Sequence, residues 1–398
     1  MKRVDAIWIA MLLMVAGCGV NRQVDERDVV ITVDVTQSYP QKELILQDFM
    51  DVEYIPLETT NEFLCQGIVR AIGKEFIIVT NRLNDGYIFV FDRNGKGLTK
   101  FNHQGRGAQE YTNINQIILD GGKREMFVND QLANQILVYD LFGNFKRSFR
   151  YEENSKYSDL YNFDENNLIC KDASIYNDEE TGVTPFVIIS KQDGSMIKSI
   201  QISCQNKRPS TIKTPHSGFF VVAYVSNFPV TSIIPYQDSW MLTVYTNDTI
   251  FRYLPDSNLI PFIIRTPSVE SGNSKANLSL GILTEGYYFL QTEKNEPEIR
   301  GTTPFDAYVE FAKTYLMYDR KDKQIYEYIV YNDDFSNKTS VNMSQNTVNE
   351  EIAFWQKLEA DDLFEAHEQG QLKGKLKEVA ADLHEESNPV IMLVKYIK

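Results

Sequence analysis

The sequence predicts an all-β protein built from repeated four-stranded sheets, and three observations carry that prediction. The stretch "IFVFDRNGKGLTKF" (88–101) has the pattern of a strand, a tight turn and a second strand, and "ILVYDLFGNFKRSF" (136–149) repeats it. Equivalent aspartates, Asp92 and Asp140, lie 48 residues apart. The third observation is the strongly apolar stretch near the end of the chain. The spacing of 48 residues between the two aspartates is typical of one blade of a β-propeller.

Five repeat units can be recognised along the chain. The first two begin with "IVRAIGKEFIIVTN" (68–81) and "INQIILDGGKREMFVND" (114–130). Looser copies follow over 161–200, 218–264 and 286–330. A four-stranded sheet has two apolar faces and cannot bury either alone, so the units are expected to stack on one another.

A sixth unit is expected to combine strands from both ends of the chain. "DVEYIPLE" (51–58) supplies strand material near the start, and "NPVIMLVKYIK" (388–398) supplies it at the end, with the closing strand over 389–397. Pairing the two ends would close the ring and remove exposed edges; the alternative is two unpaired edge strands. The sequence therefore predicts a six-bladed β-propeller over residues 30–398.

One segment, about 347–385, departs from the β pattern and is predicted to be helical. Thr347 and Glu350 have the spacing of a capping box, apolar residues recur at helical spacing, and Gly370 is a natural stop before a second helix. We expect a short helical hairpin packed on the propeller; the alternative is a helix that binds a partner.

The N-terminus has the pattern of an export signal. Residues 1–17 contain two basic residues and an apolar stretch too short to span a bilayer, and they run directly into Cys18. "VAGC" resembles the lipobox of bacterial lipoproteins, with Cys18 as the lipid attachment site and 18–29 as a lipidated linker. The alternative is an ordinary secretory peptide with an incidental cysteine. Acyl chains on Cys18 would anchor the protein to a membrane.

The expected location is the cell envelope, at the outer membrane. Gly19 follows Cys18, so the aspartate that favours retention in the inner membrane is absent. The acidic "DERD" at 25–28 lies slightly late for a surface-export signal. The periplasmic and external orientations both stay open.

The charge and the cysteines narrow the classes of partner. A formal net charge of −15 argues against nucleic acid and anionic headgroups as partners. Cys65, Cys170 and Cys204 follow the signal; Cys170 and Cys204 could form a disulfide, or all three could be free thiols in strands. Their spacing does not indicate a zinc site.

With the lipobox, the motifs "YIPLETT" (54–60), "GRGAQEY" (105–111) and "NPVIMLV" (388–394) complete a recognisable set. The chain resembles the six-bladed β-propeller lipoproteins of Bacteroidetes, which are relatives of NHL-repeat propellers. Ala108 stands where those relatives often carry proline. The resemblance implies an architecture and a location more than an activity.

The connector "NHQGRGAQEY" (102–111) is the most distinctive candidate for a ligand-binding surface. Gly105 and Gly107 would shape the loop, Arg106 would offer a guanidinium, Glu110 an acceptor and Tyr111 a stacking ring. We expect these residues at the mouth of the channel between the first two blades. The alternative is a purely structural loop in which Glu110 bonds neighbouring amides. No helix follows the glycines, which excludes a dinucleotide-binding loop.

Catalysis has less support. Propeller lyases hold a metal with several channel histidines, but His103 and His216 alone fall in propeller segments, since His367 and His384 fall in the predicted helices. A calcium or zinc ion is conceivable, but no sequence motif supports either metal. No catalytic, cofactor-binding or metal-binding residue is therefore assigned. Asp120, Asp130 and Asp172 end strands and are expected to bond turn amides.

The predicted function is therefore that of a non-catalytic, cell-envelope binding protein. The ligand would be a glycan, a peptide or an envelope protein, captured in the service of nutrient uptake. The 22 tyrosines and 23 phenylalanines could stack on sugar rings or fill the blade interfaces. The alternative is a metal-dependent hydrolase or lyase with its site in the propeller channel.

Overall fold

The computed structural model describes residues 30–82, 85–172, 174, 186–202, 210–216, 219–225, 233–244, 247–268, 271, 276–301, 303, 308–345 and 347–397. The predicted signal peptide, the lipidated Cys18 and the linker lie outside these residues, as does Cys204. No helix in the described part is long and apolar enough to cross a membrane.

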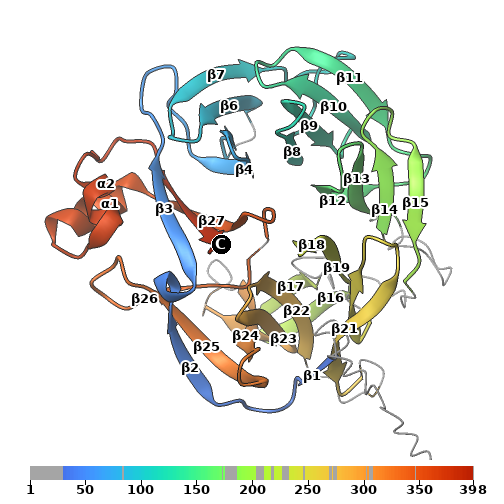
Figure 1. Ribbon diagram of the computed structural model, residues 1–398, viewed down its shortest axis with the longest axis vertical. Coiled ribbons are helices and arrows are strands. Elements are labelled where there is room, and N and C mark those ends of the chain that lie inside the picture. The colour runs from blue at the N-terminus through green and yellow to red at the C-terminus, as the bar shows by residue number, and fades with distance from the viewer. Residues whose placement is uncertain are drawn as a thin grey trace, which may run out of the picture.

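Three four-stranded antiparallel sheets form the first half of a ring around a central axis (Figure 1). In each sheet the strands follow chain order. The first sheet contains β4 (Ile68–Ile72), β5 (Phe76–Thr80), β6 (Tyr87–Asp92) and β7 (Gly97–Asn102); the second β8 (Gln116–Asp120), β9 (Glu125–Asp130), β10 (Gln135–Asp140) and β11 (Phe145–Arg150); the third β12 (Tyr157–Asn162), β13 (Asn167–Asp172), β14 (Phe186–Ser190) and β15 (Met196–Ile200).

Two larger sheets continue the ring, and each takes a strand from the N-terminal region. The fourth sheet contains β18 (Ile233–Tyr236), β19 (Ser239–Thr243), β20 (Thr249–Tyr253) and β21 (Leu259–Thr266), with β1 (Ile31–Asp34) parallel to β21. The fifth contains β22 (Ala276–Leu283), β23 (Tyr287–Arg300), β24 (Tyr308–Asp319) and β25 (Gln324–Asn332), with β2 (Gln41–Ile45) parallel to β25 and β26 (Thr339–Val341) antiparallel to it. The added strands cover edges that would otherwise stay unpaired.

The two ends of the chain meet in a smaller sheet between the fifth and first sheets (Figure 1). Strand β28 (Val390–Tyr396) lies between β27 (Ile352–Leu358) and β3 (Met50–Pro56), and its register with β3 runs from Val390 opposite Pro56 to Tyr396 opposite Met50. The expected pairing of the two ends is therefore present.

The predicted count of six blades is wrong: the protein has five blades, and the closing sheet has only three strands. Beside its outer strand β3 pack a short 3₁₀ helix (Leu46–Asp48) and the helix α2 (Gly374–Ala380), whose Lys375 ammonium donates to the Val52 carbonyl at 3.3 Å. The chain therefore uses helices at this edge, where each full blade has a fourth strand.

The predicted helical segment, about 347–385, is wrong over its first part. Residues Ile352–Leu358 form β27, and only Ala360–Glu368 (α1) and α2 are helical. Ile352, Ala353 and Phe354 are all buried, and β27 pairs with β28. Three successive buried residues are typical of a strand that is covered on both faces. Pairing with the distant strand β28 therefore outweighs the local helical spacing of the apolar residues.

The repeated Asp-x-x-Gly motif closes the outer hairpin of each of the first two blades. The Asp140 carboxylate accepts hydrogen bonds from the amides of Phe142 and Asn144, both at 2.9 Å. Asp92 accepts equivalent bonds from Asn94 and Lys96. An aspartate that bonds backbone amides two and four residues later is a stable turn cap.

The glycine of the motif joins one blade to the previous one. Gly143 has φ of +86°, and a Cβ there would lie 2.7 Å from the Phe101 ring, which ends the preceding repeat. Gly194, in the outer turn of the third blade, which lacks the motif's aspartate, has φ of +77° and meets Phe149 in the same way. The terminal phenylalanine of one blade therefore packs on the outer turn of the next blade, at a position where only glycine fits. This contact explains why the phenylalanine and the glycine recur together in the repeat.

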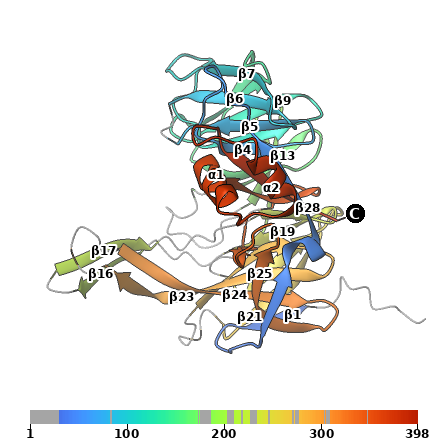
Figure 2. The same cartoon turned by 90° about the vertical axis from the view of Figure 1, so that its left-hand side faces the viewer.

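A separate hairpin, β16 (Ser210–His216) with β17 (Phe219–Val225), lies beside the far ends of β23 and β24. Figure 2 shows these elements extending from one side of the ring. They are not part of the ring of blades.

Candidate functional site

A cavity of about 1510 Å³ occupies the centre of the ring. Its wall is formed by the inner strands β4, β8 and β12, by β18 and β19, and by turns next to these strands and after β20. Residues 344–357, apart from 346 and 353, complete it. Inner strands of a propeller converge on the axis, so side chains far apart in sequence meet there.

One part of the wall is aromatic. Tyr161 and Phe163, at the end of β12, contact Trp240 of β19 with ring centroids 6.0 and 5.9 Å away. Phe163 stacks on the indole, whereas Tyr161 meets it edge-on. All three side chains are only half-buried. Trp355 of β27 lines the same cavity, so both tryptophans of the described chain face it.

The wall next to the fifth blade is supplied by a segment that the sequence analysis did not identify. The amide of Ile282 in β22 donates to the Met343 carbonyl at 3.0 Å. A Cβ at Gly281 would lie 2.5 Å from that carbonyl oxygen and 2.8 Å from the Ser344 Cα. Glycine therefore lets the chain around 343–344 lie directly on β22, and its position inside a strand was the available signal of a close backbone approach.

Arg70 contributes a cation to the wall. It lies at an irregularity in β4, where the register with β5 shifts between Val69 and Ala71. Its Nε donates to the Thr80 hydroxyl at 2.8 Å, and the residue is half-buried. Burial lowers the pKa of Arg70 from its usual value. Among the described residues no carboxylate forms an ion pair with it.

Two amide side chains near the axis, those of Gln116 and Asn162, bond to the neighbouring blade. Gln116 of β8 donates to the Leu160 carbonyl at 2.8 Å and accepts from its amide at 2.9 Å, which replaces the ladder bonds lost at an irregularity in β12. The Asn162 side chain donates to the Leu119 carbonyl at 2.8 Å. These amides hold adjacent blades together and are not free to bind a ligand.

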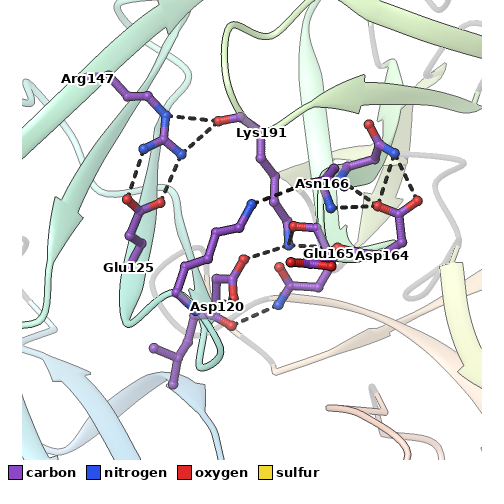
Figure 3. A network of polar contacts seen from close by, with 11 residues as sticks. Asp120, Glu125, Arg147, Asp164, Glu165, Asn166 and Lys191 are labelled. Carbon is purple, nitrogen blue, oxygen red and sulfur yellow. Dashed lines mark hydrogen bonds and ion pairs between the residues drawn. The ribbon is translucent and has the colours of Figure 1, made fainter.

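The strongest charged network joins the second and third blades (Figure 3). The Lys191 ammonium lies 2.7 Å from the Asp120 carboxylate, and the two side chains are 3% and 11% exposed. Arg147 forms two bonds to Glu125, at 3.0 and 2.9 Å, and two more to the Lys191 carbonyl. We call these four residues the blade clasp. They satisfy one another, so the clasp is structural.

The aspartates that end strands have the structural roles that were expected. Asp120 accepts from the Lys123 amide as well as from Lys191. Asp130 accepts from the Thr112 amide at 2.6 Å, and Asp172 from the Lys156 amide at 2.9 Å. Their carboxylates face neighbouring loops.

The predicted ligand-binding connector does not line the central cavity. Tyr111 is fully buried, and its hydroxyl donates to the Gly86 carbonyl at 2.6 Å. Glu110 accepts from the Gly107 amide at 2.8 Å, and a Cβ on Gly105 would collide with the same carboxylate. Arg106 is exposed, without an ion pair in the described part of the chain. The geometry gives Glu110 and Tyr111 structural contacts, and a ligand-binding role of the connector stays a prediction.

The histidines and cysteines do not converge. His103 stacks on Tyr139 at 5.4 Å, His216 lies in β16, and His367 lies in α1. Within the described ranges no three His, Cys, Asp or Glu side chains are grouped to hold a metal ion. Cys65 and Cys170 are free thiols, and burial raises the pKa of both.

Three solved structures illustrate what the fold is similar to. A candidate exported protein from Bacteroides fragilis matches with a TM-score of 0.61 and 16% identity, over 93% of this chain and 100% of that chain. A member of the DUF4221 family from Bacteroides vulgatus matches with a TM-score of 0.43 and 8% identity, over 88% of this chain and 98% of that chain. Virginiamycin B lyase from Staphylococcus aureus matches with a TM-score of 0.40 and 12% identity, over 87% of this chain and 100% of that chain.

The sequence itself matches one family model. No curated protein matches the chain. The model for the domain of unknown function DUF4934 matches residues 30–395, which includes every blade and the closing sheet. The chain therefore belongs to the DUF4934 family.

Proposed function

We propose that this protein is an exported binding protein that takes an oligosaccharide in its central cavity without transforming it. The observation that carries the proposal is the half-buried aromatic wall of Tyr161, Phe163 and Trp240. Aromatic side chains with a free face bind the apolar face of a sugar ring. A cavity of about 1510 Å³ exceeds the ~300–1,000 Å³ of a small-molecule pocket, so it has room for several sugar units.

Intrinsic fluorescence tests this proposal. Trp8 lies in the predicted signal peptide, so a chain that starts at residue 30 contains only Trp240 and Trp355, and both line the cavity. Neutral oligosaccharides of four to six units are titrated into this chain, with short peptides in parallel. We expect a saccharide to shift the tryptophan emission.

The variants Trp240→Ala and Phe142→Ala form a matched pair. Phe142 is 64% exposed on an outer turn and does not line the cavity. Loss of one aromatic contact, worth about 0.5–1.5 kcal/mol, should weaken saccharide binding up to roughly tenfold in Trp240→Ala and leave it unchanged in Phe142→Ala. Binding that leaves the emission unchanged and survives Trp240→Ala would place the ligand elsewhere. If the tryptophan emission responds to peptides and not to oligosaccharides, the ligand is a peptide and the oligosaccharide proposal is rejected.

The location belongs to the same proposal: the chain is held at the outer membrane by a lipid on Cys18. The likeness to a candidate exported protein and the lipobox-like "VAGC" support it. Cys18→Ala should move the protein from the membrane fraction to the soluble fraction. Membrane association that is the same with and without the cysteine would reject lipid anchoring.

A further inference from the structure

Arg70 is a half-buried cation of the cavity wall whose charge no carboxylate among the described residues compensates. Three other half-buried or buried arginines, Arg93, Arg147 and Arg265, each have a carboxylate within 4.0 Å, from Glu53, Glu125 and Asp248 respectively, whereas the buried Arg252 donates to the Ser239 hydroxyl. Arg70 has instead one hydrogen bond to the neutral Thr80 hydroxyl among the described residues. Withdrawing a charge from water without a counter-charge is costly, so such a group calls for a functional explanation.

The backbone places this cation at the cavity. Val69 pairs with Val79 and Ala71 with Ile78, so Arg70 is the extra residue of a β-bulge in the innermost strand. Bulges redirect one side chain and are frequent beside binding sites. The Thr80 hydroxyl holds Nε at 2.8 Å, which fixes the guanidinium and leaves the N–H groups of its two terminal nitrogens for another acceptor.

Most of the remaining charged residues of the wall are exposed. Glu75, Asp238 and Glu350 are exposed, so solvent screens them, and Glu351 is half-buried. Lys74 is exposed, and the Lys357 ammonium contacts Glu359. None of these carboxylates pairs with Arg70. An acidic ligand therefore finds one pre-positioned partner inside the cavity.

We propose that Arg70 binds the acidic group of an anionic oligosaccharide while its rings contact the aromatic wall around Trp240. The proposal rests on the oligosaccharide function above and specifies its charge. A guanidinium is planar and donates two parallel hydrogen bonds to a carboxylate or a sulfate, so either group on a sugar ring satisfies the site. Arg70 gives charge selectivity, and the aromatic wall gives affinity for sugar rings.

Calorimetric titration with three probes of matched length tests the proposal. The probes are an oligogalacturonate, its fully methyl-esterified neutral form, and a sulfated oligosaccharide that contains no carboxylate. We expect the wild-type chain to bind at least one anionic probe at least tenfold more tightly than the neutral ester. Preference for the oligogalacturonate identifies a carboxylate as the recognised group, and preference for the sulfated probe identifies a sulfate.

Three variants separate the roles. Arg70→Met keeps the aliphatic stem and removes the charge, so it should lose the anionic preference but still bind the neutral ester. Arg70→Lys keeps the charge without the fork and should be intermediate. Arg106→Ala tests the connector as the alternative site for the acidic group; because Arg106 does not line the cavity, a site at Arg70 predicts that this variant keeps the anionic preference. Circular dichroism confirms that each variant is folded.

The two proposals fail in different ways. If neutral and anionic probes bind equally and Arg70→Met changes neither, the role of Arg70 is rejected while oligosaccharide binding stands. If the anionic preference survives Arg70→Met but disappears in Arg106→Ala, the acidic group binds at the connector and the role of Arg70 is likewise rejected. If no saccharide binds the wild-type chain, the proposed function itself is rejected.

Discussion

The blade clasp and the wall of the central cavity contain the same kinds of side chain but use their charges differently. In the clasp, the Lys191 ammonium lies 2.7 Å from the Asp120 carboxylate, and Arg147 has two bonds to Glu125. In the cavity, the one hydrogen-bond partner of Arg70 among the described residues is the Thr80 hydroxyl. Arg147 of the clasp lies in the outer strand β11, whereas Arg70 lies in the innermost strand β4, next to the cavity.

The difference separates charges that stabilise the fold from a charge that is available for binding. A buried pair is strongly destabilised when one member is removed, because the other is left without compensation. A half-buried cation without a counter-charge stabilises little, and its removal costs little. The two regions should therefore respond to mutation in opposite ways.

The largest effect is expected from Asp120→Ala. It leaves the Lys191 ammonium, 3% exposed, with only carbonyl oxygens as partners, and it should lower the free energy of unfolding by about 3–5 kcal/mol. Urea-induced unfolding measures this loss. The double variant Asp120→Leu/Lys191→Met removes both charges and should recover most of the stability. A loss below about 1 kcal/mol in the single variant would mean that water already reaches the pair.

The same carboxylate makes the clasp sensitive to pH. Burial alone would raise the pKa of Asp120, but the Lys191 hydrogen bond, the Lys123 amide and the charge of Lys191 outweigh it, so the pKa lies below its usual value. The stabilisation is complete above the unfolded pKa of about 3.9, and it is lost as the pH falls through the lowered folded pKa. The stability difference between wild type and Asp120→Asn should therefore shrink as the pH drops below about 4. A difference independent of pH would exclude the ionised carboxylate as its source.

A smaller effect is expected from Arg147→Lys. Lysine keeps the positive charge but cannot form the paired bonds to Glu125 and to the Lys191 carbonyl together. We expect a loss of about 1–2 kcal/mol in the free energy of unfolding, measured as above. Arg147→Met should cost more. Equal stability of Arg147→Lys and wild type would show that charge, not geometry, holds this half of the clasp.

The smallest effect on stability is expected from Arg70→Met in the cavity. The variant loses one hydrogen bond to Thr80 and also the cost of a half-buried charge, so the free energy of unfolding should change by less than about 0.5 kcal/mol. Thermal unfolding without ligand measures it. A loss above about 2 kcal/mol would assign Arg70 a structural role and remove the contrast with the clasp.

Much of the ring could be predicted from local sequence. The Asp-x-x-Gly turns are specified by residues within four positions of one another, since Asp140 bonds the amides of Phe142 and Asn144. The closing strand could be predicted because seven apolar or aromatic residues near the end of the chain must be buried, and β3 is their partner. The structural use of Asp120, Asp130 and Asp172 followed from their places at strand ends.

The tertiary structure decided what depends on distant partners. Residues 352–358 have helical spacing, but β28 is available beside them and they form a strand. The closing sheet ends at three strands because helices, not a fourth strand, pack beside β3. The connector motif is conspicuous in sequence, yet Tyr111 turns inward and Glu110 bonds its own loop.

Arg70 was not identified from the sequence because nothing in its neighbours says whether a carboxylate will face it. Turn chemistry is settled within a few residues, so sequence determines it. Pairing of strands and of charges depends on which segments the whole fold brings together around the axis, and only the folded chain shows that Thr80 is the partner of Arg70 among the described residues.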